Sequence, residues 1–186
     1  SDIGVKGVWN DMNEPAVMEV PNKTFPMDVR HDYDGNPCSH RKAHNIYGTQ
    51  MARATYHGVK RFAYPKRPFV ITRSAYAGAQ RYSSSWTGDN VASWEHLWIA
   101  NIQMQRMSIS GMGFTGSDIG GFAEQPSGEL YARWIQLGVF HPFCRTHSSG
   151  DHGDQEPWAF DEEVTNIIRK FVNLRYQLLP YLYTMF

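Results

Sequence analysis

The sequence predicts an α/β protein in which parallel strands alternate with helices. Short apolar runs are each followed, along the chain, by segments whose apolar residues recur at helical spacing. Neither a G-x-G-x-x-G turn nor a Walker pattern follows the first run, which argues against an open nucleotide-binding sheet. Polar residues instead gather where the runs end, and catalytic residues from several strand ends are typical of a (β/α)8 barrel.

The elements can be justified in chain order from apolar runs, helical spacing and turn residues. Strands are expected at residues 4–9, 68–73, 81–86, 113–118 and 140–145. Helices are expected at residues 44–62, 93–109, 129–139 and 162–186, the last kinked or broken at Pro180 because proline lacks an N–H donor. Residues 14–39, rich in Pro, Asp and Asn, are expected to form a loop.

The pattern amounts to about five parallel strand–helix units, whereas a closed barrel needs eight units and about 250 residues. The chain has 186 residues. We therefore predict that residues 1–186 are the C-terminal portion of a (β/α)8 barrel, whose N-terminal half is absent from the sequence. The rest of its own domain would then be an obligatory partner, and a homo-oligomer is left open.

Composition excludes several classes of function. Eighteen basic residues balance 18 acidic ones, which argues against a nucleic-acid partner held by long-range electrostatics. No apolar stretch is long enough to span a membrane, and no signal peptide or metal-ligand pattern is visible, so the compartment is left open and no metal is expected. Aromatic residues make up 14% of the chain, which fits a well-filled core or a concave site that stacks on sugar rings.

Two carboxylates stand at expected strand ends, each beside a tryptophan. Asp11 follows Trp9, and it could be a nucleophile under a sugar or merely start a turn. Asp89 follows Trp86, and it could be a general acid or cap the next helix. Two carboxylates from different strand ends fit glycoside hydrolysis, in which one is the nucleophile and the other the acid.

Further polar residues could support such a pair. Arg73 is a candidate partner that keeps the nucleophile ionised, or a structural ion pair. Asp118, among glycines, suits a sugar-hydroxyl contact or a turn, and His147, after Arg145, could equally be structural.

The motifs at these strand ends resemble glycoside hydrolase family 31, the α-glucosidase and α-xylosidase family. The matching segments, in order, are WNDMNEP (9–15), RSAYAG (73–78), WTGDN (86–90), GSDIGGF (116–122) and HPFCRTH (141–147). The resemblance implies that Asp11 is the nucleophile and Asp89 the general acid and base of a retaining, exo-acting α-glucosidase without a cofactor. It makes the remaining candidates contacts to the oligosaccharide or α-glucoside substrate: Trp9, Arg73, Trp86, Asp118, Phe122, Arg145 and His147.

Retention predicts carboxyl groups about 5 to 5.5 Å apart. Within the family, α-xylosidase, α-transglucosidase and α-glucan lyase activities are alternatives, and a non-catalytic carbohydrate-binding relative is the alternative from another class. Two departures from the family stand out: Thr146 replaces the usual Asn or Asp, and barrel strands one to three with the preceding β-sandwich are absent. An incomplete barrel exposes sheet edges, so these residues alone are expected to be inactive and unstable as a soluble monomer.

Overall fold

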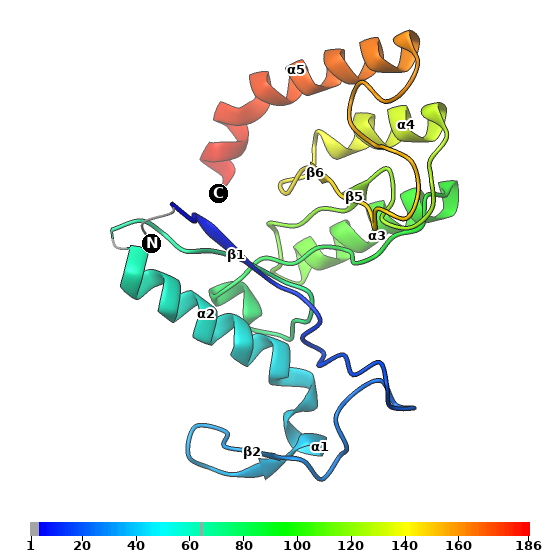
Figure 1. Cartoon of the computed structure of the whole chain (residues 1–186). Coiled ribbons are helices and arrows are strands. Elements are labelled where there is room, and N and C mark those ends of the chain that lie inside the picture. The colour runs from blue at the N-terminus through cyan, green and yellow to red at the C-terminus, as the bar shows by residue number, and fades with distance from the viewer. Residues whose placement is uncertain (1–3, 64) are drawn as a thin grey trace. The chain divides into compact units, whose positions relative to one another are not determined.

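The computed structural model describes residues 4–63 and 65–186, and it consists of two compact units, Ser1–Ser85 and Trp86–Phe186 (Figure 1). We call them the N-terminal and C-terminal units. Each contains a pair of short parallel strands covered by helices. The predicted α/β class with parallel strands is confirmed.

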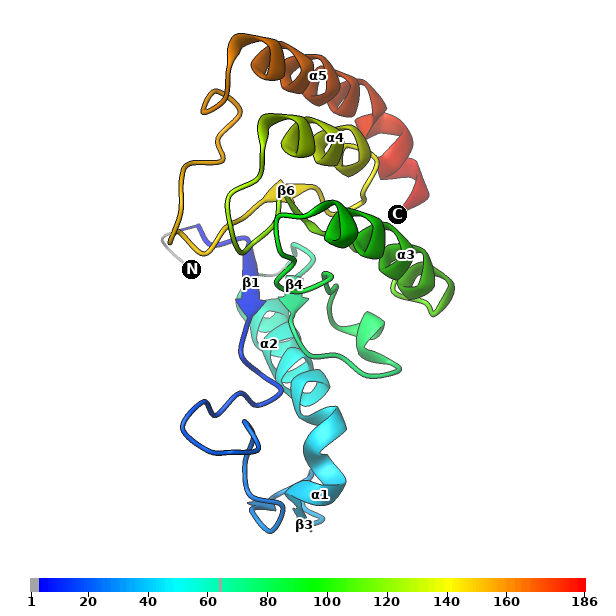
Figure 2. The same cartoon turned by 90° about the vertical axis from the view of Figure 1, so that its right-hand side faces the viewer.

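The N-terminal unit is built on strands β1 (Gly7–Asn10) and β4 (Phe69–Thr72). They pair in parallel, with Gly7 opposite Phe69 and Asn10 opposite Thr72. Helix α2 (Tyr47–Ala63) crosses between them in the sequence and packs on both strands (Figure 2). This is the βαβ arrangement that the alternating pattern predicted, and it brings the ends of β1 and β4 to one edge.

Two expectations for this unit are wrong. The predicted loop at residues 14–39 contains a small antiparallel hairpin, β2 (Arg30–His31) and β3 (Cys38–Ser39), followed by helix α1 (His40–Ala43) and the 3₁₀ turn η1 (His44–Ile46). The hairpin reverses over residues 33–35, which all have positive φ. The predicted strand at 81–86 is reduced to a single bridge between Ser84 and Ile71.

The segment after β4 also differs from a full strand–helix unit. Only the 3₁₀ turn η2 (Ala79–Arg81) lies between Thr72 and the bridge at Ser84. This connection is too short for a packed helix, so the bridge follows β4 almost directly. The N-terminal unit therefore has one α-helical crossover of full length among its described residues, and the count of five complete units is not reproduced.

The C-terminal unit contains helix α3 (Trp94–Ile109), strand β5 (Asp118–Ile119), helix α4 (Gly128–Gly138), strand β6 (Arg145–Thr146) and helix α5 (Glu162–Met185). Strands β5 and β6 pair in parallel, with Asp118 opposite Arg145. Both are shorter and lie later in the sequence than predicted. The residues before them pair irregularly: Phe143 N–H donates to the Thr115 carbonyl outside any regular ladder.

The helices of this unit begin where side-chain caps supply an acceptor. Ser93, Ser127 and Asp161 each accept a hydrogen bond from the backbone N–H three residues later. Helix α5 continues through Pro180, so of the two predicted alternatives, a kink or a break, the break is wrong. A proline removes one backbone donor, and the turn that follows gains a bond from the Thr184 hydroxyl to the Pro180 carbonyl.

The core of the C-terminal unit lies between α4, α5 and β5. Tyr131 and Trp134 of α4 are fully buried, together with Ile119 and Ile168. Figures 1 and 2 show α4 and α5 side by side, which agrees with the contacts between them. None of the helices in the described part of the chain is both long enough and apolar enough to cross a membrane.

Candidate active site

In the N-terminal unit, the predicted nucleophile and its predicted partner come together at the ends of β1 and β4. Arg73 lies between two carboxylates: its Nη1 is 3.5 Å from Asp11 Oδ1 and its Nε is 3.0 Å from Glu14 Oε1. The Asp11 side chain is 47% exposed, so it is accessible from solvent in this unit. Arg73 therefore joins the predicted nucleophile and Glu14 through two ion pairs.

The backbone around Asp11 is held by contacts between the two strand ends. Arg73 N–H donates to the Asn10 carbonyl at 2.9 Å, which extends the β1–β4 pairing by one residue. Asp11 Oδ1 accepts the N–H of Met12, which has a φ of 56°. Trp9, predicted to contact substrate, lies on β1 opposite Ile71 and is half-buried.

Asn13 is a residue that the sequence prediction did not single out, although it lies inside the motif at 9–15. It is fully buried. Its side-chain Nδ2 donates a hydrogen bond to Thr72 Oγ1 at 2.8 Å, and its Oδ1 accepts one from the Ser74 N–H at 3.0 Å. Its position two residues after a candidate nucleophile was the feature of the sequence that could have singled it out. Its partners are distant in sequence and could not be read from spacing.

In the C-terminal unit, Asp118 and Arg145 form an ion pair across β5 and β6. Arg145 Nη2 is 2.7 Å from Asp118 Oδ1, and the Asp118 side chain is completely buried. The Arg145 guanidinium also lies over the Trp86 ring, 5.7 Å from its centroid. Three predicted substrate-contact residues are thus brought together, and two of them are held by a charge-assisted hydrogen bond.

The residue that caps helix α3 is Ser93, not Asp89. Ser93 caps α3 by accepting the His96 N–H at 3.1 Å, so the alternative role proposed for Asp89 is not needed. Gly88 adopts a φ of 82°, a conformation that glycine permits. Asn90 accepts the Thr87 hydroxyl at 2.6 Å, which closes the loop around Gly88 and Asp89.

This loop is bonded to the segment that carries Phe122. The Asn90 carbonyl accepts the Phe122 N–H at 2.7 Å, and the Phe122 carbonyl accepts the Ser149 N–H at 2.9 Å. The rings of Phe122 and His147 lie 5.3 Å apart. The predicted acid and two predicted substrate contacts are therefore on connected segments.

Two buried side chains of α4 hold the loop at 116–122 in place, one directly and the other through Gln155. Trp134 Nε1 donates to Ser117 Oγ at 2.9 Å. Tyr131 donates to the Gln155 carbonyl at 2.7 Å, and Gln155 in turn donates to the Gly121 carbonyl at 3.2 Å. These residues were not predicted, because apolar periodicity marks them only as core.

Burial perturbs the ionisation of three groups in this unit. Burial, with a smaller effect from the Arg175 charge, lowers the pKa of His141 to about 4. Burial also raises the pKa of the Cys144 thiol and the Tyr131 phenol. His141 is therefore neutral and Cys144 a thiol at pH 7, and neither is a charged participant in chemistry.

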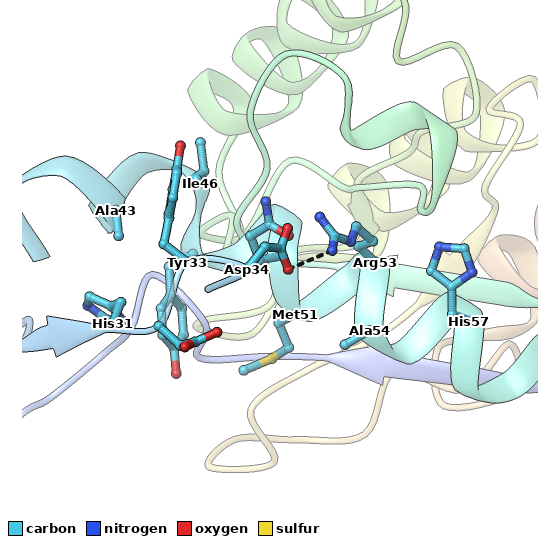
Figure 3. A pocket seen from close by; sticks show the side chains of 12 residues that line it. His31, Tyr33, Asp34, Ala43, Ile46, Met51, Arg53, Ala54 and His57 are labelled. Carbon is cyan, nitrogen blue, oxygen red and sulfur yellow. Dashed lines mark hydrogen bonds and ion pairs between the residues drawn. The ribbon is translucent and has the colours of Figure 1, made fainter. Parts of the chain in front are cut away.

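An open pocket of about 730 Å³ lies in the N-terminal unit, away from the predicted site residues (Figure 3). The hairpin contributes His31, Tyr33 and Asp34, and α2 contributes Arg53 and His57, with a 2.9 Å ion pair between Asp34 and Arg53. None of the predicted catalytic or substrate-binding residues lines it. Over residues 4–63 and 65–186, no group of three or more potential ligand side chains could hold a metal ion.

Comparison with known proteins gives one family. The model of the glycosyl hydrolases family 31 TIM-barrel domain matches residues 1–185. Alpha-glucosidase 2 of Bacillus thermoamyloliquefaciens is 49% identical over 188 residues, covering 100% of this chain and 24% of that protein. The glucosidase 2 subunit alpha of Saccharomyces cerevisiae is 48% identical, covering 96% of this chain and 19% of that protein. The chain thus spans between a fifth and a quarter of the length of these relatives.

Solved structures agree with this result. A family 31 alpha-glucosidase from Bacteroides thetaiotaomicron superposes with a TM-score of 0.87 at 40% identity, covering 98% of this chain and 29% of that one. A family 31 dextranase from Flavobacterium johnsoniae, solved with glucose, gives a TM-score of 0.83 at 35% identity, covering 99% of this chain and 23% of that one.

Proposed function

Because the chain belongs to glycosyl hydrolase family 31, we propose that it is the second half of the catalytic barrel of a retaining α-glucosidase. The whole enzyme would remove terminal α-linked glucose from oligosaccharides. The observation that carries the proposal is the accessible Asp11 carboxylate beside the Arg73 guanidinium at the ends of two parallel strands. Active sites of barrel enzymes lie at this end of the strands.

The proposed reaction follows from the two carboxylates. Asp11 attacks the anomeric carbon while Asp89, protonated, donates its proton to the leaving glycosidic oxygen. A covalent glycosyl–Asp11 ester forms, and the aglycone leaves as an alcohol. Asp89, now a carboxylate, removes a proton from water, which displaces Asp11 and releases glucose with its original configuration.

The remaining predicted residues would hold the sugar. The paired Asp118 and Arg145 offer a fixed acceptor and donor set for hydroxyl groups, since their mutual bond limits their rotation. Trp86, Phe122 and His147 offer flat faces for the ring. The names of the relatives, α-glucosidases and a dextranase, support an α-linked glucose substrate.

The proposal is tested by trapping the intermediate in the longer polypeptide that carries this chain. The protein is incubated with 5-fluoro-α-glucosyl fluoride, and peptide mass mapping is expected to find the adduct on Asp11. Asp11→Asn should abolish the adduct, whereas Asp34→Asn, a matched change at an exposed carboxylate of the hairpin, should leave it intact. Hydrolysis by the wild-type protein without an adduct, and with inverted product, would contradict the mechanism.

The role of Asp89 is tested separately. Asp89→Ala should slow hydrolysis of maltose far more than that of an activated aryl glucoside, because only the poor leaving group needs a proton. Azide should restore turnover of the variant and yield an α-glucosyl azide. Rates on isomaltose and xylosyl substrates, and longer products from maltose, distinguish α-xylosidase and α-transglucosidase, and absence of all turnover favours a carbohydrate-binding relative.

A further inference from the structure

The buried contacts between the ends of β1 and β4 point to a residue that acts on the candidate nucleophile through the backbone. We propose that Asn13, together with Thr72, is a positioning residue that fixes Asp11 relative to Arg73. The inference rests on the proposed function, since it concerns how that nucleophile is oriented.

The hydrogen bonds of Asn13 require an amide. Its Nδ2 donates to Thr72 Oγ1 at 2.8 Å, and its Oδ1 accepts the Ser74 N–H at 3.0 Å. The single hydroxyl proton of Thr72 goes to the Ser74 carbonyl at 3.0 Å, so Thr72 can only accept from Asn13. A carboxylate at position 13 would have no proton to donate, and it would place a charge in a fully buried position.

The side chains of Asn13 and Thr72 bond to each other and to the two backbone polar groups of Ser74. Ser74 is held at its N–H by Asn13 and at its carbonyl by Thr72. The Ser74 carbonyl oxygen also lies close to Gly48 at the start of α2. A Cβ added to Gly48 would be only 2.5 Å from this oxygen. Movement of the Ser74 backbone is therefore restricted by Asn13, Thr72 and Gly48.

This set of bonds involves residues that are close in sequence to both Asp11 and Arg73. Asn13 is two residues after Asp11, and Thr72 and Ser74 flank Arg73. Met12, between Asp11 and Asn13, has a φ of 56°, a region that residues with side chains rarely adopt. Anchoring Asn13 holds this unusual conformation, and with it the direction of the Asp11 carboxylate.

A second buried side-chain amide, that of Asn10 at the end of β1, supplies a matched control. Asn10 exchanges hydrogen bonds with Thr55 of α2, at 3.1 and 3.2 Å. The two side-chain bonds of this pair tie β1 to the helix and involve neither Asp11 nor Arg73, whereas the Asn10 backbone carbonyl accepts the Arg73 N–H. Thr55→Val therefore removes comparable side-chain bonds next to the site, and it leaves the backbone bond between Arg73 and Asn10 in place.

The experiment compares four variants of the longer polypeptide: Asn13→Asp, Thr72→Val, Thr72→Ser and Thr55→Val. For each, kcat and KM on an aryl α-glucoside, the rate of adduct formation with 5-fluoro-α-glucosyl fluoride and the melting temperature are measured. Misplacing a reacting group by about 1 Å costs about 100-fold in rate. Asn13→Asp and Thr72→Val should each lose about that factor in kcat and in the trapping rate, with KM changed little.

Thr72→Ser keeps the hydroxyl group, and it should retain kcat, as should Thr55→Val. Thr72→Val keeps the shape of the threonine side chain and removes only its hydroxyl group, so loss of activity in this variant with an unchanged melting temperature cannot be ascribed to general misfolding. Wild-type trapping with undiminished rates in Asn13→Asp and Thr72→Val would overturn the positioning role alone. Failure of the wild-type protein to form any adduct or to turn over α-glucosides would refute the proposed function and the positioning role with it.

Discussion

The ion pair between Asp118 and Arg145 allows a quantitative prediction about stability. Asp118 is 0% exposed and the Arg145 side chain 18% exposed, so removing the arginine leaves a buried carboxylate without its main counter-charge. Breaking a buried pair from one side costs about 3 to 5 kcal/mol. Arg145→Met, which keeps much of the side-chain volume, should lower the free energy of opening of the C-terminal unit by this amount.

Two controls separate the buried charge from other effects of the substitution. The Arg53–Asp34 pair has side chains 35% and 69% exposed, and Arg53→Met should cost only about 0.2 to 1 kcal/mol. Adding Asp118→Asn to Arg145→Met removes the buried charge that has lost its arginine, and it should recover part of the loss.

The assay is hydrogen exchange on peptides from residues 118–146 across a urea series, in the longer polypeptide that carries this chain. Local exchange reports the opening of this unit separately from the rest of the protein. If Arg145→Met costs no more than Arg53→Met, or if the double variant is less stable than Arg145→Met, the reasoning about an uncompensated buried charge is refuted.

Two further predictions concern packing and pH. Gly116→Ala would place a Cβ 1.8 Å from the Phe143 carbonyl oxygen. It should therefore destabilise the C-terminal unit by about 1 to 3 kcal/mol or more, measured by the same exchange assay. An unchanged free energy of opening would contradict the close approach. Burial lowers the pKa of His141 in the folded state from 6.5 to about 4. Between these two pH values the unfolded chain binds one proton more than the folded chain, so the free energy of unfolding falls as the pH drops from about 6.5 to about 4. The loss should reach about 3 kcal/mol, and His141→Phe should flatten the stability profile over that range; an identical slope in the variant would show that another group is responsible.

The elements that the sequence predicted well are those whose formation depends on residues close to one another in the chain. Helices α2, α3, α4 and α5 appear close to their predicted ranges, because apolar spacing and caps such as Ser93 act over a few residues. Strand lengths were predicted less well. A strand ends where its partner stops bonding, and the partners of β5 and β6 are contributed by distant segments.

The same distinction applies to the candidate site. Asp11 and Arg73 could be predicted as neighbours, because parallel strands joined by a helix present their ends at one edge. Only the structure shows that Ser93 is the residue that caps α3. The roles assigned to both carboxylates stay predictions until the trapping experiments are made.

The sequence by itself determined the alternation of strands and helices, the family and the candidate charged residues, because these follow from short motifs and local periodicity. Only the tertiary structure decided which of those residues touch. Asn13 meets Thr72 across 59 residues, and Arg145 meets Asp118 across 27. Such contacts depend on the register of paired strands and on the burial of polar groups that then need a partner, which no local pattern specifies.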